Sequence, residues 1–139
     1  MDLREAAQRS FARTSVFLAY AFGSRVWGAP RNNSDLDVGY YLFPQAQTDC
    51  LILQEDLLVA GELSDAIGIE VDLRCLARAP LQLRGHVLES GRRIYCADDV
   101  ARVNAERDLL GQYHDYKAEF EQWRRLRFAS MARRSGGPR

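Results

Sequence analysis

Near the N-terminus, a buried strand, a tight turn and two aspartates follow one another closely, and this order most restricts what the chain can fold into. The run from Val16 to Phe22 is aromatic and aliphatic throughout and ends at Gly23-Ser24, which predicts a buried strand followed by a turn. Ten residues later, Asp35-Leu36-Asp37 opens a second predicted strand, which continues to Leu42. The sequence therefore predicts one strand that ends in a tight turn and another that begins with two carboxylates.

The turn and the aspartates both suit phosphate chemistry. A strand that ends in Gly-Ser and leads into a helix leaves backbone N–H groups free to hold an anion, and the helix dipole favours negative charge there. Gly23 permits the tight backbone, and the Ser24 hydroxyl can donate to a phosphate oxygen. Asp35 and Asp37 project from one strand face, where they repel each other unless a cation or proton intervenes, so they suit Mg²⁺. The plainer alternatives are an ordinary turn and a solvated strand face, or an aspartate that caps the loop.

A third aspartate lies on another predicted strand. Residues 69–74 alternate strictly between apolar and polar, which predicts a strand with one buried face, and Asp72 lies on the polar face. If this strand pairs beside the one that carries Asp37, three carboxylates converge near the turn. Asp72 would then act as a general base or as a third metal ligand. Glu70 and Arg74 share its face and are weaker candidates for the same site.

The remaining pattern predicts an α/β (α+β) fold in a single domain. Helices are expected over residues 2–13, 24–30, 51–67, 80–89 and 98–131, with a loop at 31–34 and an edge strand at 93–96. Gly111 is an expected weak point of the last helix. We expect the domain to span residues 1–134, with a core at about 14–97, a C-terminal helical segment at about 98–131 and a disordered tail at 135–139.

Composition excludes several classes of function. Nineteen basic residues balance nineteen acidic ones, so no strong field selects a polyanion. The longest apolar stretch is too short to span a bilayer, and the N-terminus lacks the pattern of a signal peptide. Cys50, Cys75 and Cys96 are odd in number and form no Cys-x-x-Cys pair, so neither a disulfide nor a zinc site is expected. Cysteine usage therefore favours a cytoplasmic protein.

Gly23-Ser24-Arg25-Val26-Trp27-Gly28, followed by Ser34-Asp35-Leu36-Asp37-Val38, resembles the signature of the DNA polymerase β superfamily of nucleotidyltransferases, in its minimal single-domain branch. The resemblance covers residues 14–76 by motif. It implies the nucleotidyltransferase fold, a small mixed sheet flanked by helices, here with a C-terminal helical extension. The implied nucleotide-binding residues are Gly23, Ser24 and Arg25. The implied Mg²⁺ ligands and catalytic residues are Asp35, Asp37 and Asp72. Trp27 departs from the arginine common in the family.

Larger members of this superfamily carry an extra domain that binds the acceptor, and a chain of 139 residues is too short to include one. The resemblance therefore suggests that a partner protein is itself the acceptor. Minimal nucleotidyltransferase (MNT) antitoxins are encoded beside a helical HEPN ribonuclease toxin and transfer AMP from ATP onto a toxin tyrosine. This implies that the chain is an Mg²⁺-dependent antitoxin that forms a hetero-oligomer with its toxin, away from membranes and without reading a nucleic-acid sequence. Two alternatives stay open: a small-molecule or antibiotic nucleotidyltransferase, and a non-catalytic nucleotide-binding antitoxin that neutralises by occlusion.

The C-terminal region combines aromatic and basic residues. Residues 124–139 contain six arginines and no acidic residue, and four aromatic residues precede them at near-helical spacing: Tyr113, Tyr116, Phe120 and Trp123. We interpret this as a helix that packs its aromatic side on the core and ends in a solvated basic segment; the alternative is a docking surface for an acidic or RNA-binding partner. His86, His114 and Tyr116 are interpreted as structural, although Arg107 and His114-Asp115-Tyr116 resemble the toxins' own motif.

Overall fold

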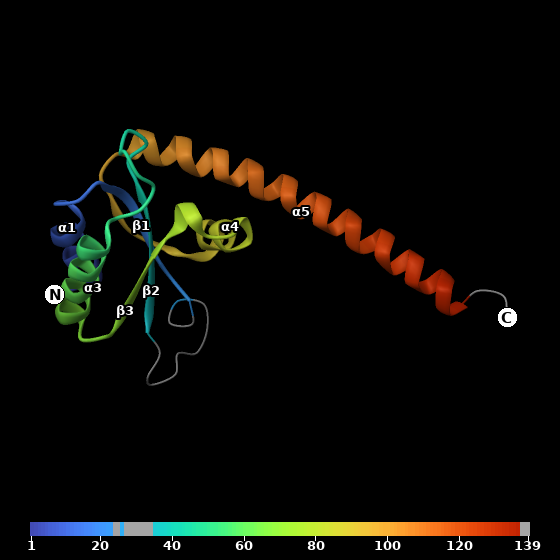
Figure 1. Ribbon diagram of the computed structural model, residues 1–139, viewed down its shortest axis with the longest axis horizontal. Helices are drawn as coiled ribbons and strands as arrows, with labels where there is room; N and C mark the ends of the chain where they lie inside the picture. Colours follow the sequence, from blue (N-terminus) through green and yellow to red (C-terminus); the bar gives the residue numbers. More distant parts are fainter. Residues whose placement is uncertain (24–25, 27–34, 137–139) are drawn as a thin grey trace.

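A four-stranded mixed sheet forms the centre of the molecule, seen here in a computed structural model (Figure 1). The structure describes residues 1–23, 26 and 35–136, with side chains as far as residue 132. Its strands are β1 (Val16–Phe22), β2 (Leu36–Leu42), β3 (Val71–Cys75) and β4 (Arg92–Cys96), in the spatial order β3-β2-β1-β4. β1 pairs antiparallel with β2 and β4, whereas β2 pairs parallel with β3.

Two helices cover one face of the sheet. α1 (Leu3–Phe11) begins at Asp2, whose carboxylate accepts a hydrogen bond of 2.8 Å from the Glu5 backbone N–H. α3 (Leu53–Ile67) ends at Gly68, which takes a left-handed conformation with φ of 73°. The buried residues between these helices and the sheet include Phe11, Val16, Ala19, Leu36, Val38, Tyr40, Val59, Leu63, Val71 and Ile94.

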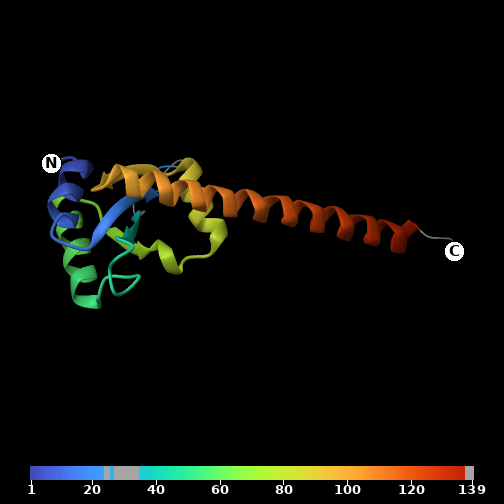
Figure 2. The ribbon, with the colours of Figure 1, turned by 90° about the horizontal axis from the view of Figure 1, so that it is seen from above.

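The other face is covered by the 3₁₀ turn η1 (Leu76–Arg78), α4 (Leu81–Ser90) and the first turns of α5 (Asp99–Gly136). Its core contains Phe17, Leu18, Tyr20, Phe22, Leu76 and Val87. α5 then continues well past the sheet as a single projecting helix (Figure 1, Figure 2). Within the described part of the chain, no helix is long and apolar enough to cross a membrane.

The predicted fold class is confirmed, and most element bounds agree to within two residues. The last helix differs: it runs through Gly111 and continues to Gly136, five residues beyond the predicted end, so it includes the first residues of the predicted disordered tail. Gly111 has open space around its Cα, and the helix passes it unbroken. The predicted helix at 24–30 and loop at 31–34 lie outside the described residues, apart from Val26, which is helical.

The expectation that the chain forms no disulfide is wrong. Cys50 and Cys75 are joined, with their Cα atoms 5.6 Å apart, and Cys96 is the free cysteine. The cause is a contact between distant segments. Parallel pairing places Cys75 beside Tyr40, and the Tyr40 hydroxyl accepts a 3.0 Å hydrogen bond from the backbone N–H of Leu51, next to Cys50. Cysteine spacing alone therefore no longer supports a reducing compartment.

Candidate active site

The register of the sheet brings two of the predicted carboxylates together. β2 and β3 run parallel, and Asp37 lies directly opposite Asp72. The strand alternation places Asp37 on the same face as Gly39, and Leu76 lies so close over Gly39 that a Cβ there would be 2.6 Å from the leucine side chain. Asp37 and Asp72 therefore sit on the α4 side of the sheet, at the end where β2 and β3 begin.

The predicted turn lies against the same carboxylate. Phe22 pairs with Asp37 across the antiparallel β1–β2 ladder, so Gly23 follows at the level of that aspartate. Gly23 has φ of 90°, and a Cβ at this position would overlap Asp37 Oδ2 and lie 3.1 Å from Asp37 Cγ. Only glycine satisfies both conditions without strain. The backbone at Gly23 thus lies so close to the Asp37 side chain that no other residue type fits between them.

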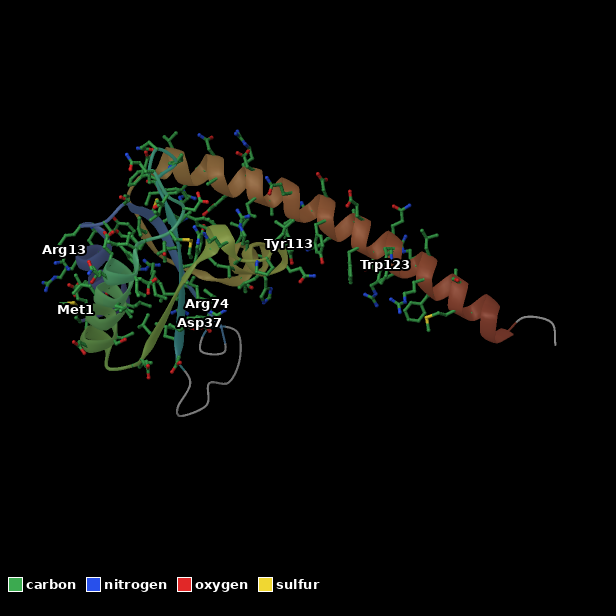
Figure 3. The ribbon with its side chains drawn as sticks, viewed as in Figure 1. Met1, Arg13, Asp37, Arg74, Tyr113 and Trp123 are labelled. Carbon is green, nitrogen blue, oxygen red and sulfur yellow. A yellow bond between two sulfur atoms is a disulfide. The ribbon has the colours of Figure 1, made fainter. Side chains whose placement is uncertain are left out.

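Arg74 completes the described group (Figure 3). Its Nη2 lies 3.2 Å from Asp72 Oδ2, and its Nε lies 3.9 Å from Asp37 Oδ1. Figure 3 shows Arg74 and Asp37 together at the end of the sheet. The guanidinium thus provides the positive charge between two carboxylates that would otherwise repel each other. Sequence reasoning named Arg74 as a lesser candidate at this site, and the structure gives it a defined place there.

The electrostatics of Asp37 reflect this crowding. Partial burial raises the pKa of Asp37 above its ordinary value, and the nearby charges of Asp72 and Asp35 raise it further, while Arg74 opposes the rise. The side chain of Asp37 is 26% exposed, against 44% for Asp72. A cation at this position would favour the ionised form of Asp37 and relieve the repulsion.

A complete metal-binding cluster is not formed by the described side chains. Asp35 is exposed and comes just before β2, and no group of three His, Cys, Asp or Glu side chains among the described residues lies close enough to hold a metal ion. Of the three carboxylates expected to converge, Asp37 and Asp72 therefore face each other. Asp35 lies outside this pair but near enough to raise the pKa of Asp37. Carboxylate pairs beside a phosphate site do fit Mg²⁺, which takes one or two protein carboxylates and completes its shell with water and substrate oxygens. Ser24 and Arg25 lie outside the described residues.

The histidines and Tyr116 stand apart from this site. Ser90 Oγ lies 3.4 Å from His86 Nδ1 near the end of α4, and the Tyr116 hydroxyl accepts a hydrogen bond from Gln82 Nε2. His114 is exposed on α5. These contacts agree with the structural interpretation of Tyr116.

Sequence reasoning did not anticipate a cavity of about 260 Å³ between the sheet, α4 and α5. Tyr41 and Arg84 line it, and within it the Tyr20 hydroxyl donates a 2.5 Å hydrogen bond to Glu106. Tyr41 lies four residues along β2 from Asp37, with Leu76 covering the strand between them. The cavity is therefore separate from the carboxylate pair.

Residues 5–100 match the family described as Polymerase beta, Nucleotidyltransferase. No curated protein matches the chain in sequence.

Solved structures resemble the chain in fold. A chain of a toxin–antitoxin complex with AMP-PNP is 21% identical, covers 86% of this chain and 93% of its own length, and has a TM-score of 0.64. A chain from the complex of a tri-AMPylated Shewanella oneidensis HEPN toxin with an MNT antitoxin is 19% identical over 86% of this chain and 91% of that one, with a TM-score of 0.62. A chain of the toxin–antitoxin complex MntA-HepT is 17% identical over 93% and 96%, with a TM-score of 0.60.

The matched family model spans both predicted motif segments and all four strands of the sheet. The chain therefore belongs to the polymerase β nucleotidyltransferase family.

Proposed function

We propose that this chain is an antitoxin enzyme that transfers AMP from ATP to a tyrosine hydroxyl of a cognate HEPN ribonuclease toxin, with Mg²⁺ as its metal. The observation that carries the proposal is the facing of Asp37 and Asp72 across adjacent parallel strands, with the Gly23 turn against Asp37. A glycine turn and paired carboxylates at one end of a sheet support nucleotidyl transfer, which needs phosphate and metal to be held close together.

In the proposed reaction, the acceptor oxygen forms a bond to the α-phosphorus of ATP, and the bond from that phosphorus to the bridging oxygen breaks, releasing pyrophosphate. Asp72 takes the proton of the attacking hydroxyl. Gly23, Ser24 and Arg25 bind the triphosphate, and Asp35 and Asp37 hold Mg²⁺, with Asp72 as a further ligand. When bound, the metal supplies positive charge that stabilises the phosphate oxygens during the displacement.

The choice of acceptor rests on two observations. The solved structures with the same fold are complexes of antitoxins with toxins, and one of those toxins is tri-AMPylated. The sheet and the helices α1, α3 and α4 that pack on it all lie before residue 98, and beyond them α5 extends alone. A protein acceptor brings its own fold to the site, so this arrangement suits a protein better than a free small molecule. Because the donor is ATP, we place the reaction in the cytoplasm.

Labelled ATP tests this proposal. The chain would be mixed with α-labelled ATP, Mg²⁺ and the product of the neighbouring gene, and label on that protein would be measured. We expect transfer by the wild type, loss of more than a hundredfold in Asp35→Asn/Asp37→Asn, and normal transfer in the control Asp65→Asn, an exposed carboxylate on α3. Label that survives in the double variant would contradict the proposal. A double variant that transfers nothing and still neutralises the toxin fully would instead indicate occlusion.

A further inference from the structure

The outer half of α5, residues 118–136, projects away from the domain. Its inner half is attached to α4: the Tyr113 ring lies where a Cβ on Gly85 would be, and Lys117 Nζ lies 3.1 Å from Glu89 Oε1. Beyond Lys117 both ribbon views show the helix running alone, away from the sheet and the other helices (Figure 1, Figure 2). At 1.5 Å per residue, residues 118–136 extend the helix by roughly 28 Å.

The side of α5 that packs on the domain continues onto this projecting part. Tyr113, Tyr116, Phe120 and Trp123 follow at alternating intervals of three and four, which keeps them on one face of a helix. Their rings stack in series, with centroids 6.5, 5.9 and 6.0 Å apart. The first two are partly covered, whereas Phe120 and Trp123 are 42% and 51% exposed. We call these four residues the α5 stripe; its inner half has a partner in α4, and its outer half is uncovered.

The segment that follows the uncovered half is basic. Arg127 continues the same face, with its guanidinium carbon 5.2 Å from the centroid of the Trp123 ring. Six arginines and no acidic residue occupy residues 124–139. Of these, Arg124, Arg125 and Arg127 lie among the described side chains directly after the exposed rings, and Arg124 also pairs with Glu121 at 3.6 Å. Exposed aromatic and arginine side chains together are the usual composition of protein interfaces.

The stripe faces the catalytic side of the molecule. In Figure 3, Tyr113 and Trp123 lie on the side of α5 toward α4, and Asp37 and Arg74 lie on that same side. A protein bound along the uncovered stripe would thus lie in the angle between α5 and the domain. From there it can present a side chain to the carboxylate pair.

On the basis of the proposed function, we infer that the outer half of the α5 stripe is the docking surface for the acceptor protein, which contributes an apolar groove edged with carboxylates. The groove covers Phe120 and Trp123, and its carboxylates pair with Arg125 and Arg127. The ring faces of the stripe are already stacked on one another and on Arg127, so they offer little room for the bases of a nucleic acid.

A matched pair of variants tests this surface. Phe120→Ala/Trp123→Ala removes the uncovered rings, and Phe128→Ala removes an aromatic side chain that is 66% exposed on the same projecting segment. Phe128 points about 140° away from Trp123 and about 80° away from Phe120 around the helix, so it lies outside the stripe. Both variants should unfold at the wild-type temperature, because none of these side chains is part of the core.

Binding of the purified neighbouring gene product would be measured by calorimetry. We expect the stripe variant to bind at least tenfold more weakly than the wild type, and Phe128→Ala to stay within about threefold. In the labelled-ATP assay the stripe variant should show a raised KM for the acceptor protein with kcat retained. Asp35→Asn/Asp37→Asn should bind the acceptor as tightly as the wild type does.

Three results would overturn the inference. The first is wild-type affinity in the stripe variant, or a wild type that does not bind the neighbouring gene product. The second is a wild-type dimer in sedimentation that the stripe variant abolishes, which would assign the stripe to a second copy of this chain. The third is an RNA affinity lost in the stripe variant while acceptor affinity stays unchanged. Stripe-dependent binding without any transfer of label would contradict the proposed function alone and leave the docking surface in place.

Discussion

Replacing Gly23 with alanine separates the two roles of the turn, its backbone conformation and its contact with a carboxylate. At φ of 90° an alanine is strained, at a cost of about 1–2 kcal/mol. The new Cβ would also overlap Asp37 Oδ2, so the carboxylate must move away by about 1 Å or more to restore a normal contact. Displacements of that size at a reacting group reduce rates by about a hundredfold. We therefore expect a stability loss of about 1–2 kcal/mol together with about a hundredfold loss of transfer rate.

Gly68 provides the matched control. It also has positive φ, at 73°, and nothing lies within 4 Å of a Cβ built there. Gly68→Ala should lose a similar 1–2 kcal/mol of unfolding free energy. Its rate of transfer should nevertheless match the wild type. Urea unfolding and initial rates of labelled-AMP transfer measure the two effects on the same samples. Two results would refute the reasoning: a transfer rate in Gly23→Ala equal to that of the wild type, or equal losses of transfer rate in Gly23→Ala and Gly68→Ala.

Three further predictions concern charge and cross-linking. Arg74→Gln removes the cation between Asp37 and Asp72, so a metal ion should bind there more tightly. With Mn²⁺ as a probe for Mg²⁺, calorimetry should show binding that is about two- to fivefold tighter than in the wild type. Equal or weaker binding would contradict this role of Arg74. Cys50→Ser should lower the free energy of unfolding by about 3.5 kcal/mol for a loop of 25 residues, and the wild type with reductant should lose as much; an unchanged urea midpoint would contradict it. Hydrogen bonds from Arg13 and Ser10 hold the pKa of Glu62 below its ordinary value of 4.5, so the stability that Glu62 adds is present above that pH and disappears as pH falls through the lowered pKa. Urea unfolding of the wild type and Glu62→Gln should therefore differ at pH 7, and the difference should shrink as the pH falls through the lowered pKa; a constant difference would argue against the ion pair.

Local patterns were enough to predict the strands and helices. The seven apolar residues of β1 end at a glycine, so both bounds of that strand were predicted correctly. Alternation at residues 69–74 predicted β3 and placed Asp72 on the polar face, and the structure confirms that this strand pairs beside the one carrying Asp37. Short-range periodicity determines which residues form an element, so sequence is informative there.

Contacts between distant segments could not be predicted in the same way. The approach of Gly23 to Asp37 depends on the antiparallel register of β1 and β2, in which Phe22 pairs with Asp37. The Cys50–Cys75 disulfide depends on how α3 turns the chain back, so that the end of β3 lies beside the segment that follows β2. The extent of α5 was underestimated because a basic, glycine-containing end predicts disorder, whereas helix propensity continues unbroken through residues 124–134.

The disulfide and the carboxylate pair lie on opposite faces of the sheet. Along β3, Val71 and Cys75 lie on the face covered by α1 and α3, and alternation places Asp72 and Arg74 on the other. The disulfide is therefore only three residues from Asp72 but on the opposite face. Reduction should then relax the connection between β2 and α3 without changing the charges around the carboxylate pair. Folding stability and transfer rate should respond separately to reductant, because neither cysteine of the disulfide lies on the face that carries Asp37 and Asp72.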